Sequence, residues 1–346
     1  MSTTAANPGA FASPLRSPIV VRLAGLAIVS VLLIWLVPLA LPDYWVRLTT
    51  SALILSIAAA SVSLIFAQLG MVSLGQQAVM GVGAWAALRI GHGLPVPFEV
   101  SLMGAGITGA GFGVLMALPS LRTRGVYFAL STLMVESAFQ VAIGVVGFPD
   151  GGPGFLGRVS FGNRTVMARP WLGQTDLSYL RYCAVAAIVC LVLVAVHGRT
   201  RPGRAWAQIR SGEAAAIVGG VNIPAFQLWA FALSGFLAGV SGGLLAGHLG
   251  NLDPTVFPAG QSILLFAAAI VGGAFNWFGP LVSGFLMRMV PGLLTDWNMD
   301  GNVATVLFGV ALLHALVTAP RGIAAQLANL IEGIGRRVSN WRAWVR

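Results

Sequence analysis

The sequence predicts an all-α polytopic membrane protein with about ten transmembrane helices, since a helix of about 20 residues crosses about 30 Å of hydrocarbon. Hydrophobic residues make up 57% of the chain and charged residues only 9%, a composition that excludes an ordinary soluble globular protein. Apolar windows of about 20 residues, the length of a membrane-spanning helix, recur along the chain. The 44 glycines fall largely within these windows, where small residues allow helix backbones to approach closely in lipid.

The apolar windows place the predicted spans in order. They cover residues 20–41, 48–66, 73–90, 97–117, 126–146, 180–197, 228–249, 261–273, 280–294 and 303–317. The first window is longer than the apolar core of a signal peptide and lacks a clear cleavage site, so we expect an uncleaved span. The windows divide the chain into an N-terminal tail (1–18), a transmembrane domain (19–322) and a basic C-terminal tail (323–346). Two polar inserts interrupt the domain, at 147–179 and 198–224.

The distribution of arginine predicts how the chain is oriented. The net charge is +10, and the insert at 198–224 contains a group of basic residues: Arg199, Arg201, Arg204 and Arg210. By the positive-inside rule this insert is cytoplasmic, both termini are cytoplasmic and the insert at 147–179 is external. Because the arginines lie at span ends and in the tails, we expect them to set orientation, and we expect no nucleic-acid partner.

Several kinds of chemistry are not expected. Cys183 and Cys190 share one predicted span, and seven positions on a helix separate them by about 10 Å, too far for a disulfide. The four histidines show no metal-ligand spacing. No Walker A sequence occurs, so ATP hydrolysis is not expected of this chain. The sequence therefore predicts no cofactor, no metal site and no catalytic residue.

The insert at 198–224 carries the most informative motif. Residues 206–218 are predicted to form one short helix that ends at Gly219 and Gly220, and an apolar span rich in small residues follows. The motif consists of Glu213, Ala215, Ala216, Gly220 and Asn222, followed by Phe231, Ser234, Gly235, Ala238 and Gly239. It resembles the signature of the LivM-type permease subunits of branched-chain amino acid ABC importers. The alternative is an ordinary loop helix in front of a small-residue span.

In that family a short cytoplasmic helix is the coupling element, which sits in a groove of the ATPase subunit. The resemblance therefore implies a set of ATPase-coupling residues: Arg210, Glu213, Ala215, Ala216, Gly220 and Asn222.

A second block, LRTRGVYFAL at 121–130 together with Thr132, Leu133 and Glu136, is similar to another motif of the family. Glu136 falls about three helical turns into its span, close to the bilayer midplane. A carboxylate at that depth is costly unless it is paired or neutralised, so it is a functional candidate. We expect Glu136 to line the translocation pathway. The alternative is a structural glutamate that is protonated or paired internally.

The span at 73–90 has a start interrupted by glycine. The stretch LGMVSLGQQA at 69–78 resembles a family motif in which His is common at the position of Gln76. Broken helices at membrane depth occur where they line protein or a water-filled cavity. Ser73, Gln76 and Gln77 are therefore expected in the translocation pathway, although hydrogen bonding between helices would explain them equally well.

The resemblance covers residues 69–322 and implies a type II ABC importer-like permease. The segments at 150–154 and 272–280 resemble an external loop and a turn of the family. The two glycine-interrupted segments, at 70–75 and 272–280, are compatible with an inverted pseudo-repeat.

The implied function is that of the membrane-spanning permease subunit of an ATP-driven importer for branched-chain or related amino acids, working by alternating access. The implied partners are a second permease subunit of the LivH type, two cytoplasmic ATP-binding subunits and an external solute-binding protein. All would act at the bacterial inner membrane. Three alternatives remain: an importer of urea or short amides, a proton-coupled secondary transporter that uses Glu136, and a purely structural membrane scaffold.

Overall fold

A computed structural model describes residues 42–123, 125–159, 164–297, 303, 306, 309, 310, 313, 314, 317 and 322–327. The N-terminal tail, the predicted span at 20–41, most of the predicted span at 303–317 and the end of the C-terminal tail lie outside these residues. Every regular element in the described part is helical, as the sequence predicts. Six helical stretches there are long and apolar enough to cross a membrane: Asp43–Leu69, Phe98–Leu121, Val126–Val146, Asp176–His197, Ile223–Leu249 and Pro254–Gly272. The chain is therefore an all-helical, multi-pass membrane protein.

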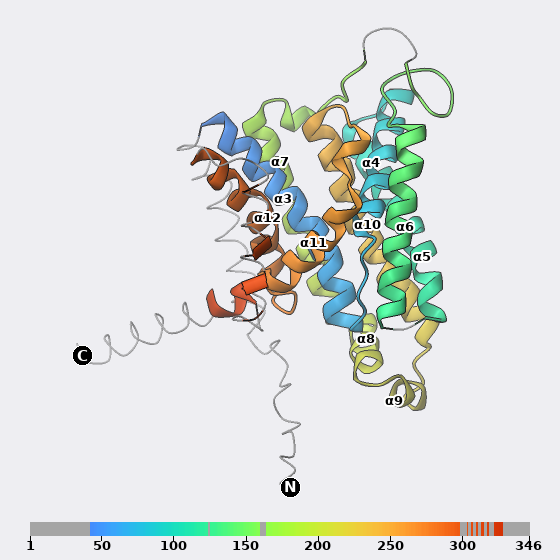
Figure 1. Ribbon diagram of the computed structural model, residues 1–346. Coiled ribbons are helices and arrows are strands. Elements are labelled where there is room, and N and C mark those ends of the chain that lie inside the picture. Colours follow the sequence, from blue (N-terminus) through green and yellow to red (C-terminus); the bar gives the residue numbers. More distant parts are fainter. Residues whose placement is uncertain are drawn as a thin grey trace, which may run out of the picture.

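The helices of the bundle follow the predicted spans from 48–66 to 280–294. They are α3 (Asp43–Leu64), α4 (Gln76–Gly93), α5 (Phe98–Ala117), α6 (Val126–Val146), α7 (Asp176–His197), α10 (Ile223–Leu249), α11 (Ala259–Gly272) and α12 (Gly279–Asp296) (Figure 1). Three short helical turns lie between them: η4 (Leu118–Leu121), η5 (Trp171–Gly173) and η6 (Pro254–Val256). The span at 126–146 has the same limits in the sequence prediction and in the structure, because Gly125 and Gly147 bound a predominantly apolar run.

Glycine determines how α4, α5 and α10 pack. A Cβ atom added at Gly109 of α5 would overlap the carbonyl of Gly235 in α10, and one added at Gly113 would overlap the carbonyl of Phe231. On the other face of α10, a Cβ atom at Gly242 would overlap the carbonyl of Met80 in α4. Backbones at such short range make extensive van der Waals contact, which is the main force that holds helices together in lipid.

The other side of the bundle is formed by α3, α7 and α12. A Cβ atom at Gly284 of α12 would overlap the carbonyl of Ala52 and the hydroxyl of Ser56, both on α3. The hydroxyl of Tyr179 on α7 donates to the carbonyl of Leu244 on α10 across 2.6 Å, within the buried core. Ser241 of α10 also donates to the carbonyl of Ile54 in α3 at 2.7 Å, so α3, α7, α10 and α12 form one packed unit.

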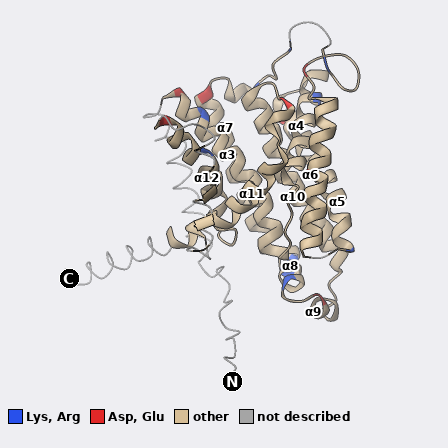
Figure 2. Cartoon of the chain, in the orientation of Figure 1, with Lys and Arg blue, Asp and Glu red and all other residues tan. Residues whose placement is uncertain are grey.

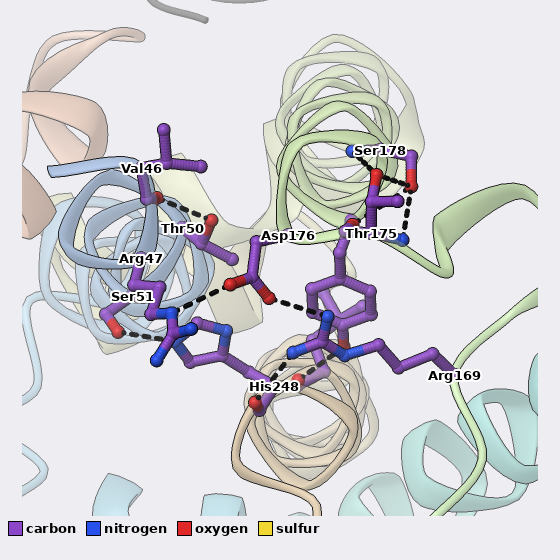
Figure 3. Close-up of polar contacts among 11 residues, drawn as sticks. Val46, Arg47, Thr50, Ser51, Arg169, Thr175, Asp176, Ser178 and His248 are labelled. Carbon is purple, nitrogen blue, oxygen red and sulfur yellow. Dashed lines mark hydrogen bonds and ion pairs between the residues drawn. The ribbon is translucent and has the colours of Figure 1, made fainter. Parts of the chain in front are cut away.

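One end of this unit carries a network of charged groups (Figure 3). Asp176, at the start of α7, accepts hydrogen bonds from Arg47 of α3 and from Arg169 of the preceding loop, each at 2.7 Å. The guanidinium of Arg169 also lies 5.1 Å from the ring centre of Tyr179, and the ring of His248 on α10 is 3.1 Å from the hydroxyl of Ser51. The network connects the end of the 147–170 loop, at Arg169, with α3, α7 and α10.

The opposite end carries the polar insert, as α8 (Arg201–Ser211) and α9 (Glu213–Val218). These short helices lie at the lower end of the bundle in Figure 1, and the segment at 147–159 lies at the upper end. Most of the charged residues lie near one end or the other, and the middle of the bundle is almost free of them (Figure 2). This distribution is typical of a protein whose middle lies in hydrocarbon.

The predicted single helix at 206–218 is wrong. Gly212 has an extended backbone and divides the segment into α8 and α9. The predicted end at Gly219 and Gly220 is correct: Gly220 adopts a left-handed conformation, with φ of 75°. The amide of Val221 bonds to the carbonyl of Ala216 at 2.9 Å, and that of Gly220 bonds to Ile217 at 2.9 Å. This pair of bonds is the Schellman motif, which favours glycine at the left-handed position.

Candidate functional site: a broken helix and a coupling segment

The helical structure is interrupted between α3 and α4, so that α4 begins in the buried part of the bundle. The end of α3 widens into a π-helical turn, η3 (Ile65–Leu69), and Gly70 follows in a left-handed conformation with φ of 73°. Residues 70–75 have no regular secondary structure, and α4 begins at Gln76. A helix that starts inside the protein has free backbone N–H groups that need acceptors. The break therefore creates a polar site in an apolar bundle.

Glu136 of α6 supplies one of the missing acceptors. Its Oε2 atom accepts the backbone N–H of Ala78 at 2.6 Å and the hydroxyl of Ser262 at 2.8 Å. The hydroxyl of Ser262, on α11, also accepts the backbone N–H of Gln77 at 3.2 Å. A carboxylate at a helix N-terminus is stabilised by the free N–H groups and by the helix dipole. Glu136 and Ser262 together cap α4 from two other helices.

Glu136 belongs to a polar stripe on α6, formed by Thr132, Glu136 and Gln140. Residues four apart lie on one face of a helix. Thr132 Oγ1 accepts the backbone N–H of Leu74 at 2.9 Å, and Gln140 Oε1 accepts that of Ala259, the first residue of α11, at 3.1 Å. The stripe therefore binds α6 to the backbone of the break and to the start of α11.

The sequence-predicted pathway residues meet at this break, although their side chains have different surroundings. Gln76 Oε1 accepts a hydrogen bond from Ser61 of α3 at 3.3 Å. Three other buried polar atoms have no hydrogen-bond partner among the described residues: Ser73 Oγ, Gln77 Nε2 and Glu136 Oε1. Buried polar groups in proteins are usually hydrogen-bonded, so a group of free ones requires an explanation. They offer a donor and an acceptor to a small polar ligand.

Sequence reasoning missed Ser262 and Gln140 and did not assign a partner to Thr132. Ser262 could have been noticed, because it follows Gln261 at the start of an otherwise apolar span. Ser131 and Ser137, also polar and close to Glu136 in sequence, bond only to carbonyls of their own helix, at 2.8 Å and 3.1 Å.

Aromatic contacts of α6 occur on both sides of Glu136 along the helix. Toward the end of the bundle that carries the 147–159 segment, Phe139 and Phe148 both contact the buried ring of Phe257, with ring centres 6.4 Å and 5.6 Å apart. Toward the other end, Phe128 contacts Phe231 of α10 at 5.6 Å. Glu136 lies between these two aromatic layers in the sequence of α6, and its side chain is fully buried.

The predicted coupling segment, which consists of α8 and α9 and is called the coupling segment below, exposes one face and buries the other. Trp206 of α8 is fully buried, and its Nε1 donates to the carbonyl of Phe226 in α10 at 2.8 Å. On α9, Ala216 is buried, whereas Ile217 is 64% exposed and Val218 is 90% exposed. Exposed apolar side chains on a polar insert are typical of a docking surface.

The remaining sequence-predicted coupling residues surround this surface. Ala215 and Gly220 are exposed, and Asn222 caps α10 by accepting the backbone N–H of Ala225 at 3.3 Å. A hollow of about 370 Å³ lies beside α9 and is lined by Ser120, Leu121, Glu213, Ile217, Val221, Asn222, Ile223, Pro224 and Gln227. Ala216, which the sequence also places in this set, lies on the inner side of the helix, against the rest of the protein.

Arg210, predicted as a coupling residue, contacts two other parts of this chain. Its Nη1 atom donates to the carbonyl of Ala67 in η3. Its guanidinium carbon lies 4.7 Å from the ring centre of Phe275, in the turn between α11 and α12. Arg210 thus connects the coupling segment to the helix end that precedes the break.

The family model described as "Branched-chain amino acid transport system / permease component" matches residues 44–316. The LivM high-affinity branched-chain amino acid permease protein of Escherichia coli K12 is 25% identical over 273 residues, which are 73% of this chain and 64% of the relative. The LivM protein of Salmonella typhimurium LT2 is 24% identical over 297 residues, or 80% of this chain and 69% of the relative.

A probable LivH permease protein of Methanocaldococcus jannaschii is 28% identical over 147 residues, 39% of this chain and 45% of the relative. The match to the E. coli LivM protein covers 64% of the length of that protein. No solved structure shows a significant match. The family match extends from α3 beyond α12 and so includes both the break and the coupling segment. The chain belongs to the family of permease components of branched-chain amino acid transport systems.

Proposed function

We propose that this chain is the membrane-spanning permease subunit of an ATP-driven importer for branched-chain or related amino acids. The observation that carries the proposal is the exposed apolar surface of α9, at Ile217 and Val218, on a segment that is anchored to the bundle through Trp206. An ATP-binding subunit docked on this surface would supply the hydrolysis. The permease itself carries out no covalent chemistry.

The proposed assembly contains a second permease subunit of the LivH type, two cytoplasmic ATP-binding subunits and an external solute-binding protein in the bacterial inner membrane. We assign about ten spans, consistent with the length of the apolar windows, with the tails at 1–18 and 323–346 in the cytoplasm. The insert at 198–224 would be cytoplasmic and the insert at 147–179 external. The arginines of α8, at the end opposite the 147–159 segment, support this orientation.

We assign the break between α3 and α4 to the translocation pathway, with Ser73, Gln76, Gln77 and Glu136 along it. The free Oε1 atom of Glu136 is an acceptor suited to an ammonium group, and Gln77 Nε2 is a donor suited to a carboxylate. An amino acid carries both groups. The burial of all four side chains supports a path that is closed to solvent in this conformation.

Reconstituted uptake tests the proposal. The chain would be co-expressed with its partner permease and ATP-binding subunits, placed in vesicles with the solute-binding protein outside, and assayed with radiolabelled leucine. We expect uptake that requires ATP in the compartment that contains the ATP-binding subunits. Uptake that follows an imposed proton gradient without ATP would overturn the proposal, and uptake of urea in place of leucine would overturn its substrate class.

A further inference from the structure

The π-helical end of α3 has a carbonyl group that its own backbone does not satisfy. The amide of Gly70 bonds to the carbonyl of Phe66 at 3.0 Å, and the chain then turns away in the left-handed conformation. The next carbonyl, that of Ala67, accepts no backbone bond among the turns and loops that the structure describes. Arg210 of α8 donates to it instead. A cation at a helix C-terminus satisfies such a carbonyl and also interacts favourably with the helix dipole.

Arg210 is held in place by more than this one bond. Its guanidinium lies over the ring of Phe275 at 4.7 Å, within the range of a cation–π interaction. The ring of Phe275 in turn contacts that of Phe66 in η3, with centres 5.7 Å apart, and Phe66 contacts Phe266 of α11 at 5.4 Å. The Arg210 stem is also close to Gly70, since a Cβ atom added there would lie 3.4 Å from Cγ of the arginine. Through Arg210, Phe275 and Phe66, the coupling segment, the α11–α12 turn and η3 therefore contact one another.

The break at 70–75 thus has a charged group from elsewhere in the chain at each end. Arg210 caps the helix that enters the break, and Glu136 caps the helix that leaves it, through the amide of Ala78 at 2.6 Å. Six residues separate the two capped helices. Arg210 therefore links α8 directly to the start of the break.

We propose that Arg210 is a positioning residue that transmits movement of the coupling segment to the break between α3 and α4. This inference rests on the proposed docking of α8 and α9 to an ATP-binding subunit. It differs from the expectation that Arg210 binds that subunit directly, because its Nη1 atom is directed at Ala67 and its guanidinium face at Phe275. Arginine is suited to this role because its planar group stacks and donates at once, which lysine cannot do equally well.

The test uses the assembled complex in lipid nanodiscs and vesicles, with Arg210→Ala, Arg210→Lys, Phe275→Leu and the double variant Arg210→Ala/Phe275→Leu. Arg204→Ala, on the exposed face of the same helix, is the control. Three quantities are measured: the ATP-binding subunit that co-purifies, the rate of ATP hydrolysis and the uptake of radiolabelled leucine. The first two also report whether each variant is folded and assembled.

We expect Arg210→Ala to retain the ATP-binding subunit and ATP hydrolysis while uptake per ATP hydrolysed falls about tenfold, the effect of losing one charged hydrogen bond. Arg210→Lys should lie between wild type and Arg210→Ala. The double variant should be no worse than Arg210→Ala, because both changes break the same contact. Normal uptake per ATP in Arg210→Ala, or additive losses in the double variant, would overturn the inference.

Loss of the co-purified subunit in Arg210→Ala would also overturn it, by placing the residue in the docking surface. That outcome would leave the proposed function intact. A different result would contradict the proposed function itself. In that case the wild-type complex would contain no ATP-binding subunit, or it would take up leucine without ATP.

Discussion

The hydroxyl of Ser262 donates to Oε2 of Glu136 across 2.8 Å and accepts the backbone N–H of Gln77 at 3.2 Å. One serine therefore joins a buried carboxylate on α6 to the first turn of α4. The two carboxylate oxygens of Glu136 therefore differ in their hydrogen bonding. Oε2 is occupied by Ser262 and Ala78, and Oε1 has no partner among the described residues. The occupied oxygen has a structural role, and the other remains available for a ligand.

Glu136→Gln and Glu136→Leu separate these two roles. Glutamine keeps an acceptor for Ala78 and Ser262, so this variant should be about as stable in detergent as wild type. Its leucine uptake should fall about tenfold or more, because the charge that would meet an ammonium group is lost. The Glu136→Leu substitution leaves the buried donors of Ala78 and Ser262 without an acceptor, which should lower the free energy of unfolding by about 1–3 kcal/mol. Thermal unfolding and vesicle uptake measure both effects, and normal uptake in Glu136→Gln would remove this residue from the pathway.

Ser262→Ala should weaken the start of α4. The change leaves the N–H of Gln77 without its acceptor and removes one hydrogen bond to Glu136, a loss of about 1–3 kcal/mol for a buried donor. The unfolding temperature in detergent should fall. Ser137→Ala is the matched control, because its exposed hydroxyl bonds only to the carbonyl of Leu133 in its own helix. Equal unfolding temperatures for the two variants would contradict the capping role of Ser262.

Gly109→Ala should disrupt the packing of α5 against α10. The added methyl group would overlap the carbonyl of Gly235, and overpacking of this kind costs about 1–3 kcal/mol. Gly111→Ala, two positions away, has nothing within 4 Å of the new methyl group. That control should be neutral or slightly stabilising, since alanine favours a helix over glycine by up to about 1 kcal/mol. Yield and unfolding temperature in detergent should separate the two variants.

Val218→Arg should leave the protein inserted in the membrane but prevent docking of the ATP-binding subunit. The side chain is 90% exposed, so a charge there does not disturb the bundle. A charge without a partner in an apolar docking groove costs several kcal/mol, so co-purification of the ATP-binding subunit should be lost. The membrane level of the variant, by immunoblot, is the control. A variant that keeps both the subunit and ATP-dependent uptake would exclude α9 from the docking surface.

Cysteine labelling tests the orientation. Ser160→Cys, in the insert at 147–179, should react with a membrane-impermeant maleimide in intact cells. Thr200→Cys and Ser339→Cys should react only after the cells are opened. Background should be low, because both native cysteines, Cys183 and Cys190, are buried. The reverse pattern would place the coupling segment outside and contradict the whole transport assignment.

The sequence predicted those features that depend on neighbouring residues. Apolar windows located α3, α4, α5, α6, α7, α10, α11 and α12, and Gly70 and Gly75 marked the break. The position of Glu136 follows from its distance along one helix. The partners of Glu136 did not follow, because Ser262 is 126 positions away, and Arg210 is 143 positions from Ala67. Such pairs depend on how helices pack, which hydrophobic periodicity does not encode. The helix predicted at 206–218 was wrong because Gly212 outweighed the helix propensity around it.

The stripe on α6 has a mechanical consequence. Thr132, Glu136 and Gln140 repeat once per helical turn, and each accepts one backbone N–H. Two of these amides, those of Leu74 and Ala78, belong to the break and to the first turn of α4, and the third, that of Ala259, begins α11. A shift of α6 along its own axis would therefore lengthen hydrogen bonds to both segments at once. In this way α6 ties the position of the break to the position of α11.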